Sequence, residues 1–168
     1  MDNIIAATCA CGKVEIEACG APIMTGICYC SDCQAGGRMI EALSNAPKVL
    51  NGDGGSDYIL HRKSRTRIVK GAELLKPLKL KKGSGTNRVI ASCCNSAMLL
   101  NFDGSQHWLD LYRNRITRGQ AAPVQMLVCT KTAPDPERLP KGIPNYPGLS
   151  LRFIGRMIRD RLAMAVGF

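Results

Sequence analysis

Short runs in which apolar and polar residues alternate recur through the first 130 residues of the chain, and they predict β-strands. In the clearest run, Val14 and Ile16 alternate with Glu15 and Glu17, as expected for a strand that buries one face. Pro77 lies in one of these runs and predicts an edge strand, because proline cannot donate a hydrogen bond to a neighbouring strand. The other runs span residues 22–29, 58–61, 66–69, 74–81, 88–91 and 124–129. The pattern predicts a mainly β fold of short antiparallel strands.

The pattern changes near the C-terminus, where apolar residues recur at helical spacing. Ser150 is a suitable N-cap for this segment, which predicts an amphipathic helix of about four turns. We expect the apolar face to pack on the domain or on a second copy of the chain, so that the protein can form a homo-oligomer. A basic helix lying on a membrane surface is the alternative. The apolar positions are Leu151, Ile154, Ile158, Leu162 and Ala165.

These patterns divide the 168 residues into three parts. Residues 1–132 form the predicted domain, residues 133–149 form a proline-rich linker, and residues 150–166 form the helix. No apolar run is long enough to span a membrane, and the first residues lack the features of a signal peptide. We therefore expect a cytoplasmic protein.

The net charge of +10 is concentrated in the middle of the chain. Residues 61–88 contain ten basic residues and the single acid Glu73, which would attract an anion or an acidic surface. However, Leu78 and Leu80 alternate with Lys79 and Lys81, so the charge is also explained by a strand with one solvated face. Aromatic residues make up 5% of the chain and do not interleave with the basic segment, so a nucleic acid is not expected as a partner.

Seven of the nine cysteines form three tight groups. Thiols stay reduced in the cytosol, where such close spacing favours metal binding over disulfides. Three sulfurs spaced C-x-C-x-x-C can surround one soft ion such as Zn²⁺ and leave its fourth position open. The groups are Cys9 and Cys11; Cys28, Cys30 and Cys33; and Cys93 and Cys94.

Two metal sites are the simplest arrangement of these groups. Cys28, Cys30 and Cys33 lie close enough in sequence to bind one ion alone. Cys9 and Cys11 need partners, and the available sulfurs are those of Cys93 and Cys94. Such a site would close a loop of more than eighty residues, as structural zinc sites do. The sequence therefore predicts one or two Zn²⁺ ions.

The same residues carry a resemblance to a known family. The segments Cys9-x-Cys11-Gly12 and Cys28-Tyr-Cys30-Ser-Asp-Cys33-Gln34, with a third cysteine group sixty residues later, resemble the glutathione-dependent formaldehyde-activating enzyme family, which includes centromere protein V. The resemblance covers roughly residues 5–130. This chain has Cys93-Cys94-Asn95-Ser96 where the family usually has C-x-x-C-G-T-P, and it is similar to a branch that reads C-C-N-T-P.

The resemblance implies a tent-like β fold that binds zinc. It implies an open catalytic zinc at Cys28, Cys30 and Cys33, and a closed structural zinc at Cys9, Cys11 and Cys94. Ala91 stands where the family has a further cysteine, so the structural site lacks one ligand unless Cys93 supplies it.

Three thiolates around Zn²⁺ leave a net charge of −1, which disfavours hydrolysis but suits a site that holds a fourth thiol as thiolate. With the resemblance, this predicts a carbon–sulfur lyase that acts on adducts of small aldehydes with glutathione or another small thiol. One alternative is a non-catalytic, zinc-stabilised binding module that uses a basic face for an anionic partner. Another is a thiol carrier or redox sensor whose triplet is often free of metal.

The remaining candidate residues have simpler interpretations. Cys19 and Cys129 stand alone and are expected to be small buried apolar residues. His61 and His107 lack the spacing of ligands and are expected to be structural. Asp32 would orient a ligand or cap a turn, and Gly36-Gly37 is expected to serve tight backbone geometry.

Overall fold

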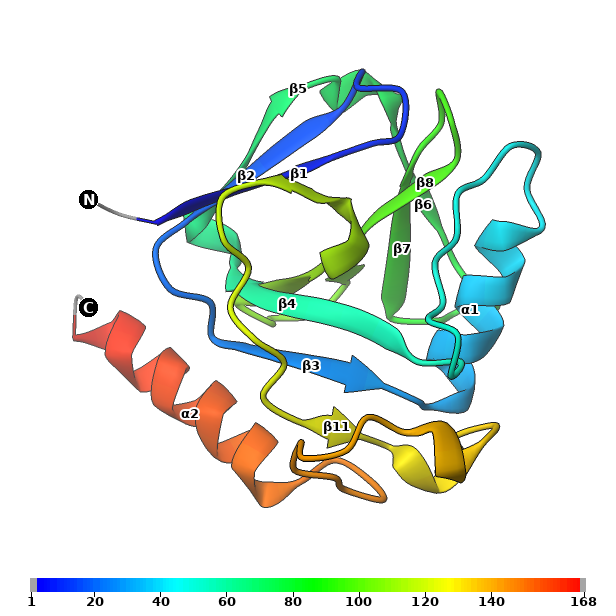
Figure 1. Ribbon diagram of the computed structural model, residues 1–168. Coiled ribbons are helices and arrows are strands. Elements are labelled where there is room, and N and C mark those ends of the chain that lie inside the picture. The colour runs from blue at the N-terminus through cyan, green and yellow to red at the C-terminus, as the bar shows by residue number, and fades with distance from the viewer. Residues whose placement is uncertain (1–2, 167–168) are drawn as a thin grey trace.

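The computed structural model describes residues 3–166, which form two β-sheets and two α-helices (Figure 1). One sheet has four strands in the order β10 (Ile116–Arg118), β1 (Ile4–Thr8), β2 (Glu15–Cys19) and β5 (Thr66–Lys70). The other has seven strands in the order β11 (Leu127–Val128), β3 (Met24–Cys28), β4 (Ser56–Arg62), β9 (Trp108–Tyr112), β8 (Ser96–Phe102), β7 (Thr86–Ala91) and β6 (Leu75–Leu78). The helices are α1 (Ser31–Glu41) and α2 (Leu151–Ala165), and short 3₁₀ turns span Lys63–Arg65, Ala72–Leu74, Arg113–Arg115, Thr130–Thr132 and Pro136–Arg138.

The mainly β prediction is confirmed, with one correction to the strand directions. The two-residue strand β11 runs parallel to β3, whereas the other strand pairs are antiparallel. Pro77 lies on β6, which is an edge strand of the seven-stranded sheet, as the sequence predicts.

The strands of the seven-stranded sheet bury both of their faces. On β4, Ile59 joins the core between the two sheets, while Tyr58 and Leu60 join the core on the opposite face. Side chains of α1 and α2, including Ile40 and Met157, belong to this second core. The molecule is therefore layered, with the four-stranded sheet on one face of the large sheet and the helices on the other (Figure 1).

The helix α1 was missed in the sequence, and it contains the two adjacent glycines. Gly36 and Gly37 are buried within this helix and do not form a turn. A Cβ atom on Gly36 would lie 1.8 Å from Nε of Arg88, and one on Gly37 would lie 2.4 Å from Leu50. Both glycines therefore let side chains approach the helix backbone closely.

Residues 133–149 pack against the domain and are not a free linker. Asn145 forms a bridge with Leu127 on β11, and the amide of Leu127 donates to the carbonyl of Pro144 at 2.8 Å. Ala133, Leu139 and Ile143 contact a small buried cluster that contains Tyr29. Apart from the 3₁₀ turn Pro136–Arg138 the segment has little regular structure, but it still covers the β11 edge.

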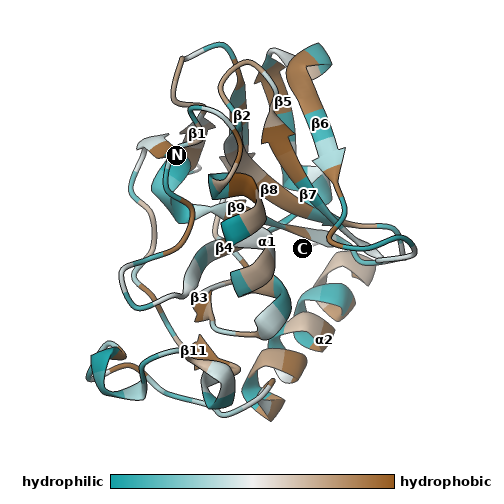
Figure 2. Ribbon diagram, turned by 90° about the vertical axis from the view of Figure 1, so that its right-hand side faces the viewer, coloured by the Kyte–Doolittle hydropathy of each residue, from teal (hydrophilic) through white to brown (hydrophobic). Residues whose placement is uncertain are grey.

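The C-terminal helix is confirmed, including its N-cap: the Ser150 hydroxyl accepts a hydrogen bond from the amide of Phe153 at 3.1 Å. The predicted apolar face does not pack on the domain, because its residues are exposed and the helix contacts the core through others. Leu151 is 86% exposed and Leu162 is 63% exposed, whereas Met157 is buried and Phe153 contacts the core. Figure 2 shows hydrophobic and hydrophilic residues mixed along this helix. The homo-oligomer expected through α2 stays a prediction.

Two side chains of the domain hold α2 through its one acidic residue. Nη2 of Arg62 lies 2.7 Å from Oδ1 of Asp160, and Nε2 of His107 lies 2.9 Å from Oδ2 of the same carboxylate. His107 therefore has a structural role, as expected. Within residues 3–166, no helix is long and apolar enough to cross a membrane.

Candidate metal centres

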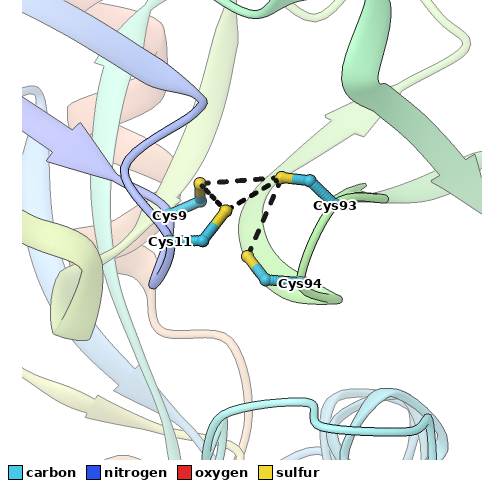
Figure 3. Close-up of side chains that lie close together, drawn as sticks. All are labelled: Cys9, Cys11, Cys93 and Cys94. Atoms are coloured by element: carbon cyan, nitrogen blue, oxygen red, sulfur yellow. Dashed lines mark hydrogen bonds between the residues drawn. The ribbon is translucent and has the colours of Figure 1, made fainter.

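Four cysteines meet where the turns of two hairpins face each other (Figure 3). Cys9 and Cys11 lie on the turn between β1 and β2, and Cys93 and Cys94 lie on the turn between β7 and β8. The sulfur of Cys93 lies 3.9 Å from that of Cys9, 3.3 Å from that of Cys11 and 3.9 Å from that of Cys94. All four sulfurs lie within 4.8 Å of one another, so this group is defined here as the staple cluster.

Local backbone geometry aims these sulfurs at one point. Gly12 and Asn95 have left-handed backbone conformations, with φ of 73° and 53°, and each tightens its hairpin turn. The amide of Val14 donates to the sulfur of Cys9 at 3.2 Å, and the Ser96 hydroxyl lies 3.1 Å from the sulfur of Cys94. Such bonds to sulfur orient ligands in thiolate metal sites.

The thiols of the staple cluster titrate differently. Burial raises the pKa of Cys94, but the Ser96 hydroxyl and the amides of Cys11 and Ser96 lower it more, to about 6. Burial, and after it the neighbouring thiols, raise the pKa of Cys93 to about 12. In the absence of an ion, Cys94 is therefore the thiolate of this pair near neutral pH.

The staple cluster fits a tetrahedral zinc ion. Zinc–sulfur bonds of about 2.3 Å require sulfur separations of about 3.8 Å, close to those observed. Ala91 is fully buried in the core between the sheets and offers no ligand, whereas Cys93 provides the fourth sulfur. Because the two hairpins belong to different sheets, an ion held here would join the sheets directly.

A second group, defined here as the triplet, lies at the junction of β3 and α1. Cys28 ends β3, Cys30 is the N-cap of α1, and Cys33 lies in its first turn. Their sulfurs lie within 4.8 Å of one another. The Cys30 sulfur accepts a hydrogen bond from the amide of Cys33 at 3.3 Å, so the cap of this helix is a thiol. The positive end of the helix dipole favours thiolates at this position.

The thiols of the triplet differ in their pKa values. The pKa of Cys30 is lowered, first by interaction with the Cys28 and Cys33 thiols and then by backbone amides at the helix start. The pKa of Cys28 is raised, first by the thiol of Cys129 and then by Cys30 and Cys33. Cys30 therefore carries negative charge most readily, and three thiols of this kind form a suitable donor set for Zn²⁺.

A cavity of about 230 Å³ adjoins the triplet and is lined by all three cysteines. One row of paired residues across the large sheet forms much of its wall, because residues that pair directly point to the same face. Arg88 pairs with Leu100, Leu100 with Asp110, and Asp110 with Leu60. The lining is otherwise mainly apolar, with Met24, Phe102, Val128 and Phe153.

Three polar groups stand out in this cavity wall. Arg88 is 2% exposed, and its Nη2 donates to the carbonyl of Asp32 at 2.5 Å. Asp110 is buried with no partner for Oδ1, and burial raises the pKa of its carboxyl to about 7. The Tyr58 hydroxyl donates to the Cys33 sulfur at 3.7 Å. The Arg88 guanidinium, the Asp110 carboxyl and the Tyr58 hydroxyl thus lie around the cavity next to the triplet.

Cys129 is the main correction to the sequence interpretation. It was expected to be an isolated buried residue, but it is half-buried and its thiol interacts with that of Cys28. The parallel pairing of β11 with β3 brings it there, and a strand of two residues leaves little signal in the sequence. Arg88 and Asp110 were also missed as cavity residues, because their place depends on strand register.

The other candidates belong to neither group of sulfurs, although Asp32 lies between Cys30 and Cys33 and lines the cavity. His61 is fully buried and its Nε2 lies 3.4 Å from the carbonyl of Gly20. Asp32 is exposed in the first turn of α1, and the cap of that helix is Cys30. Cys19 ends β2 and belongs to neither cluster.

Comparisons with known proteins give a family and one distantly similar solved structure. None of the curated proteins compared matches the chain significantly. A solved structure of a Rhodobacter sphaeroides protein from structural genomics is similar, with 17% identity, a TM-score of 0.48, and coverage of 84% of this chain and 98% of that one. A family model described as a family of unknown function, DUF6151, matches residues 1–109, which include all seven cysteines of the staple cluster and the triplet. The chain therefore belongs to the DUF6151 family.

Proposed function

We propose that this protein is a zinc-dependent carbon–sulfur lyase-like protein that handles adducts of small aldehydes with a glutathione-type thiol. The observation that carries the proposal is the opening of three thiols onto a mainly apolar cavity that contains a buried cation and a buried acid. The resemblance of the cysteine motifs to the glutathione-dependent formaldehyde-activating enzyme family supports the same reaction class.

In this proposal Cys28, Cys30 and Cys33 hold the reactive zinc ion. When bound, the ion would lower the pKa of a fourth thiol and hold it as a thiolate, which can add to or leave from an aldehyde carbon. The hydrogen bond from Tyr58 to Cys33 and the amide bond to Cys30 would keep the ligands oriented.

The cavity residues would act on the adduct. Arg88 would attract a carboxylate of the thiol, because a buried guanidinium binds carboxylates strongly. Asp110 has a pKa of about 7, so its carboxyl can give or take the proton of the adduct hydroxyl near neutral pH. The apolar wall would exclude water and so limit competing hydration of the aldehyde.

The staple cluster would hold a second, structural zinc in a β-tent arrangement. Its four cysteines would leave no position for a substrate, in contrast to the triplet. Metal content of one to two equivalents is therefore expected, with the staple ion serving stability.

A second candidate function rests on a different cavity. Arg62, Arg65, Arg156 and Arg159 line a pocket of about 370 Å³ between α2 and the start of β3, with Asp160 as its acidic residue. This excess of positive charge favours a non-catalytic binding module for an anionic partner.

Calorimetric titration with glutathione tests the primary proposal. Wild-type protein and Cys19→Ser should bind it, whereas Cys30→Ser should not, because only the last substitution removes a ligand of the triplet. Added salt should weaken binding, since attraction between exposed charges is screened over about 10 Å at 0.1 M ionic strength. If no small thiol binds at millimolar concentration, the binding-module function takes precedence. Binding that survives replacement of all three triplet cysteines by serine would rule out the triplet as receptor.

A further inference from the structure

Cys129 lies directly beside the triplet although it is almost a hundred residues away in sequence. β11 pairs with β3 so that Val128 is opposite Cys28, and the amide of Tyr29 donates to the carbonyl of Val128 at 3.0 Å. Cys129 is the next residue after Val128, and its thiol interacts with that of Cys28. It lies beyond residues 1–109, which match the family model.

The backbone of Cys129 has an unusual conformation that affects where its thiol lies. Successive residues of a strand point to opposite faces, so an extended Cys129 would point away from the side of Val128 and Cys28. Instead, φ is 57° and ψ is 33°, and this left-handed turn ends the strand. The alternation therefore stops at Cys129.

This conformation is costly for a cysteine. A residue with a Cβ atom is strained in the left-handed region, where glycine and asparagine are more easily accommodated. The other non-glycine residues with positive φ among residues 3–166 are Asn45 and Asn95. At Cys129 the Thr132 hydroxyl donates to its carbonyl at 3.0 Å, and its amide donates to the carbonyl of Gly148 at 3.3 Å. The surrounding loop thus holds a thiol in a position that glycine would occupy more easily.

Cys129 lies next to the triplet, but its sulfur is not within 4.8 Å of all three triplet sulfurs. The sulfurs that all lie within 4.8 Å of one another are those of Cys28, Cys30 and Cys33, whereas the staple cluster includes four cysteines under the same limit. The triplet thus has three close sulfurs and a fourth thiol on the side of Cys28.

We propose that Cys129 is an internal fourth ligand of the triplet's metal ion, which an external thiol must displace. This inference rests on the proposed zinc site and adds a regulatory step to it. When an external thiol takes the fourth position, the Cys129 thiolate leaves it and accepts the proton that the incoming thiol gives up. The exchange is balanced in charge and involves no oxidation. Such a cap would protect the site from stray thiols and metal loss while substrate is absent.

Cobalt-loaded protein gives a direct test, because Co²⁺ occupies zinc sites and its visible spectrum reports the ligands. The variants are Cys129→Ser, Cys129→Gly and the matched control Cys19→Ser, which removes a cysteine outside both clusters. Cys129→Gly suits the left-handed backbone, so it should fold even if the serine variant does not. Without added thiol, both Cys129 variants should show an altered cobalt spectrum, and the control should match the wild type.

Glutathione titration of the same samples measures the competition. The wild type and Cys19→Ser should require at least about tenfold more glutathione than the Cys129 variants for half-saturation, because a tethered thiol competes at a high effective concentration. Identical thiol-free spectra for the wild type and Cys129→Gly would overturn the inference, as would equal half-saturation. If the thiol-free spectra differ but glutathione binds to no variant, Cys129 is a ligand and the proposed lyase-like function fails instead.

Discussion

At the scale of single residues, the two cysteine clusters differ in what lies around their sulfur atoms. In the staple cluster, the sulfurs of Cys9 and Cys94 are contacted by an amide and a hydroxyl, and four thiols face one another. In the triplet, the sulfurs border a cavity that also contains Asp110 and Arg88. We therefore assign the proposed chemistry on an external molecule to the triplet, where burial raises the pKa of the Asp110 carboxyl to about 7.

Replacing Asp110 by asparagine should remove a pH dependence of stability. Burial raises the pKa of its carboxyl from the ordinary 3.8 to about 7 in the folded protein, so the folded state holds the proton more tightly than the unfolded state does. This stabilisation is complete below the unfolded pKa and is lost as pH rises through about 7. Between pH 6 and pH 8 the wild type should lose about 1 kcal/mol of unfolding free energy from this group, and Asp110→Asn should not. Urea unfolding at both pH values measures the difference.

Asp103→Asn is the matched control for this measurement. Asp103 is exposed just after β8, and the Lys79 ammonium lowers the pKa of its carboxyl, so it stays ionised throughout this range. The control should keep the pH dependence of the wild type. If Asp110→Asn keeps it as well, the carboxyl of Asp110 ionises normally and cannot serve as the proposed proton carrier.

At the scale of secondary structure elements, α2 depends on polar contacts as well as on apolar packing, and one of these contacts is the hydrogen bond that Nη1 of Arg156 donates to Oε1 of Gln125. Asp160 pairs with Arg62 and His107, whereas Leu151, Ile158 and Leu162 remain exposed. The apolar contacts of the helix come mainly from Met157 and Phe153. Docking of α2 therefore requires the carboxylate, whose side chain is 14% exposed.

Asp160→Asn should loosen this helix. The substitution removes the negative charge that pairs with Arg62 where both side chains are mostly buried. The free energy that holds α2 on the domain should therefore fall by about 2 kcal/mol. Hydrogen exchange of residues 151–165 should become roughly tenfold faster or more, since 1.4 kcal/mol corresponds to a tenfold change in the opening equilibrium. Arg161→Gln, on the exposed side of the same helix, should leave the exchange unchanged. Equal exchange in Asp160→Asn and the wild type would show that α2 is held without the Asp160 carboxylate, by its apolar contacts and the hydrogen bond from Arg156 to Gln125.

The strands were more predictable from the sequence than the helices were. Alternation at Val14 and Ile16 reflects direct burial of one face, so it is visible without any knowledge of the fold. The helix α1 was missed because Gly36 and Gly37 disfavour helix intrinsically, and only close contact with Arg88 and Leu50 explains them. The buried face of α2 was misjudged because Asp160 binds partners that lie far away in the chain.

At the scale of the whole molecule, the staple cluster links the two sheets. Cys9 and Cys11 come from the four-stranded sheet, and Cys93 and Cys94 come from the seven-stranded sheet. The triplet instead joins one strand to the helix that directly follows it. Loss of an ion should therefore affect global stability at the staple cluster and local chemistry at the triplet.

Cys11→Ser should therefore destabilise the protein far more than Cys30→Ser. Weaker binding of the metal ion that joins distant segments should lower the free energy of unfolding by about 3 kcal/mol or more. This corresponds to a decrease of roughly 10 °C in Tm. Serine at position 30 retains an N-cap acceptor for α1, so the fold should persist while thiol binding is lost. Thermal unfolding of both variants, with glutathione titration of the folded one, makes the comparison. If Cys30→Ser lowers the Tm more than Cys11→Ser does, the structural and reactive roles of the two clusters are reversed.

The cysteine clusters show how far sequence reasoning reaches at this scale. The triplet is local in the chain, so its spacing alone predicted it. The staple cluster was predicted by the need of Cys9 and Cys11 for partners, although the part played by Cys93 was decided only by the hairpin turn. The cavity and Cys129 depend on the register of β7, β8, β9 and β11, which no short motif encodes.

Metal analysis of the purified protein, prepared without chelator, tests the central claim most directly. The wild type should contain one to two equivalents of zinc, and no more than one should remain after Cys28, Cys30 and Cys33 are all replaced by serine. The remaining zinc should be bound by four sulfurs in its X-ray absorption spectrum, as the staple cluster requires. A folded wild-type protein that contains no zinc, and whose cysteines form disulfides or remain free, would contradict the account.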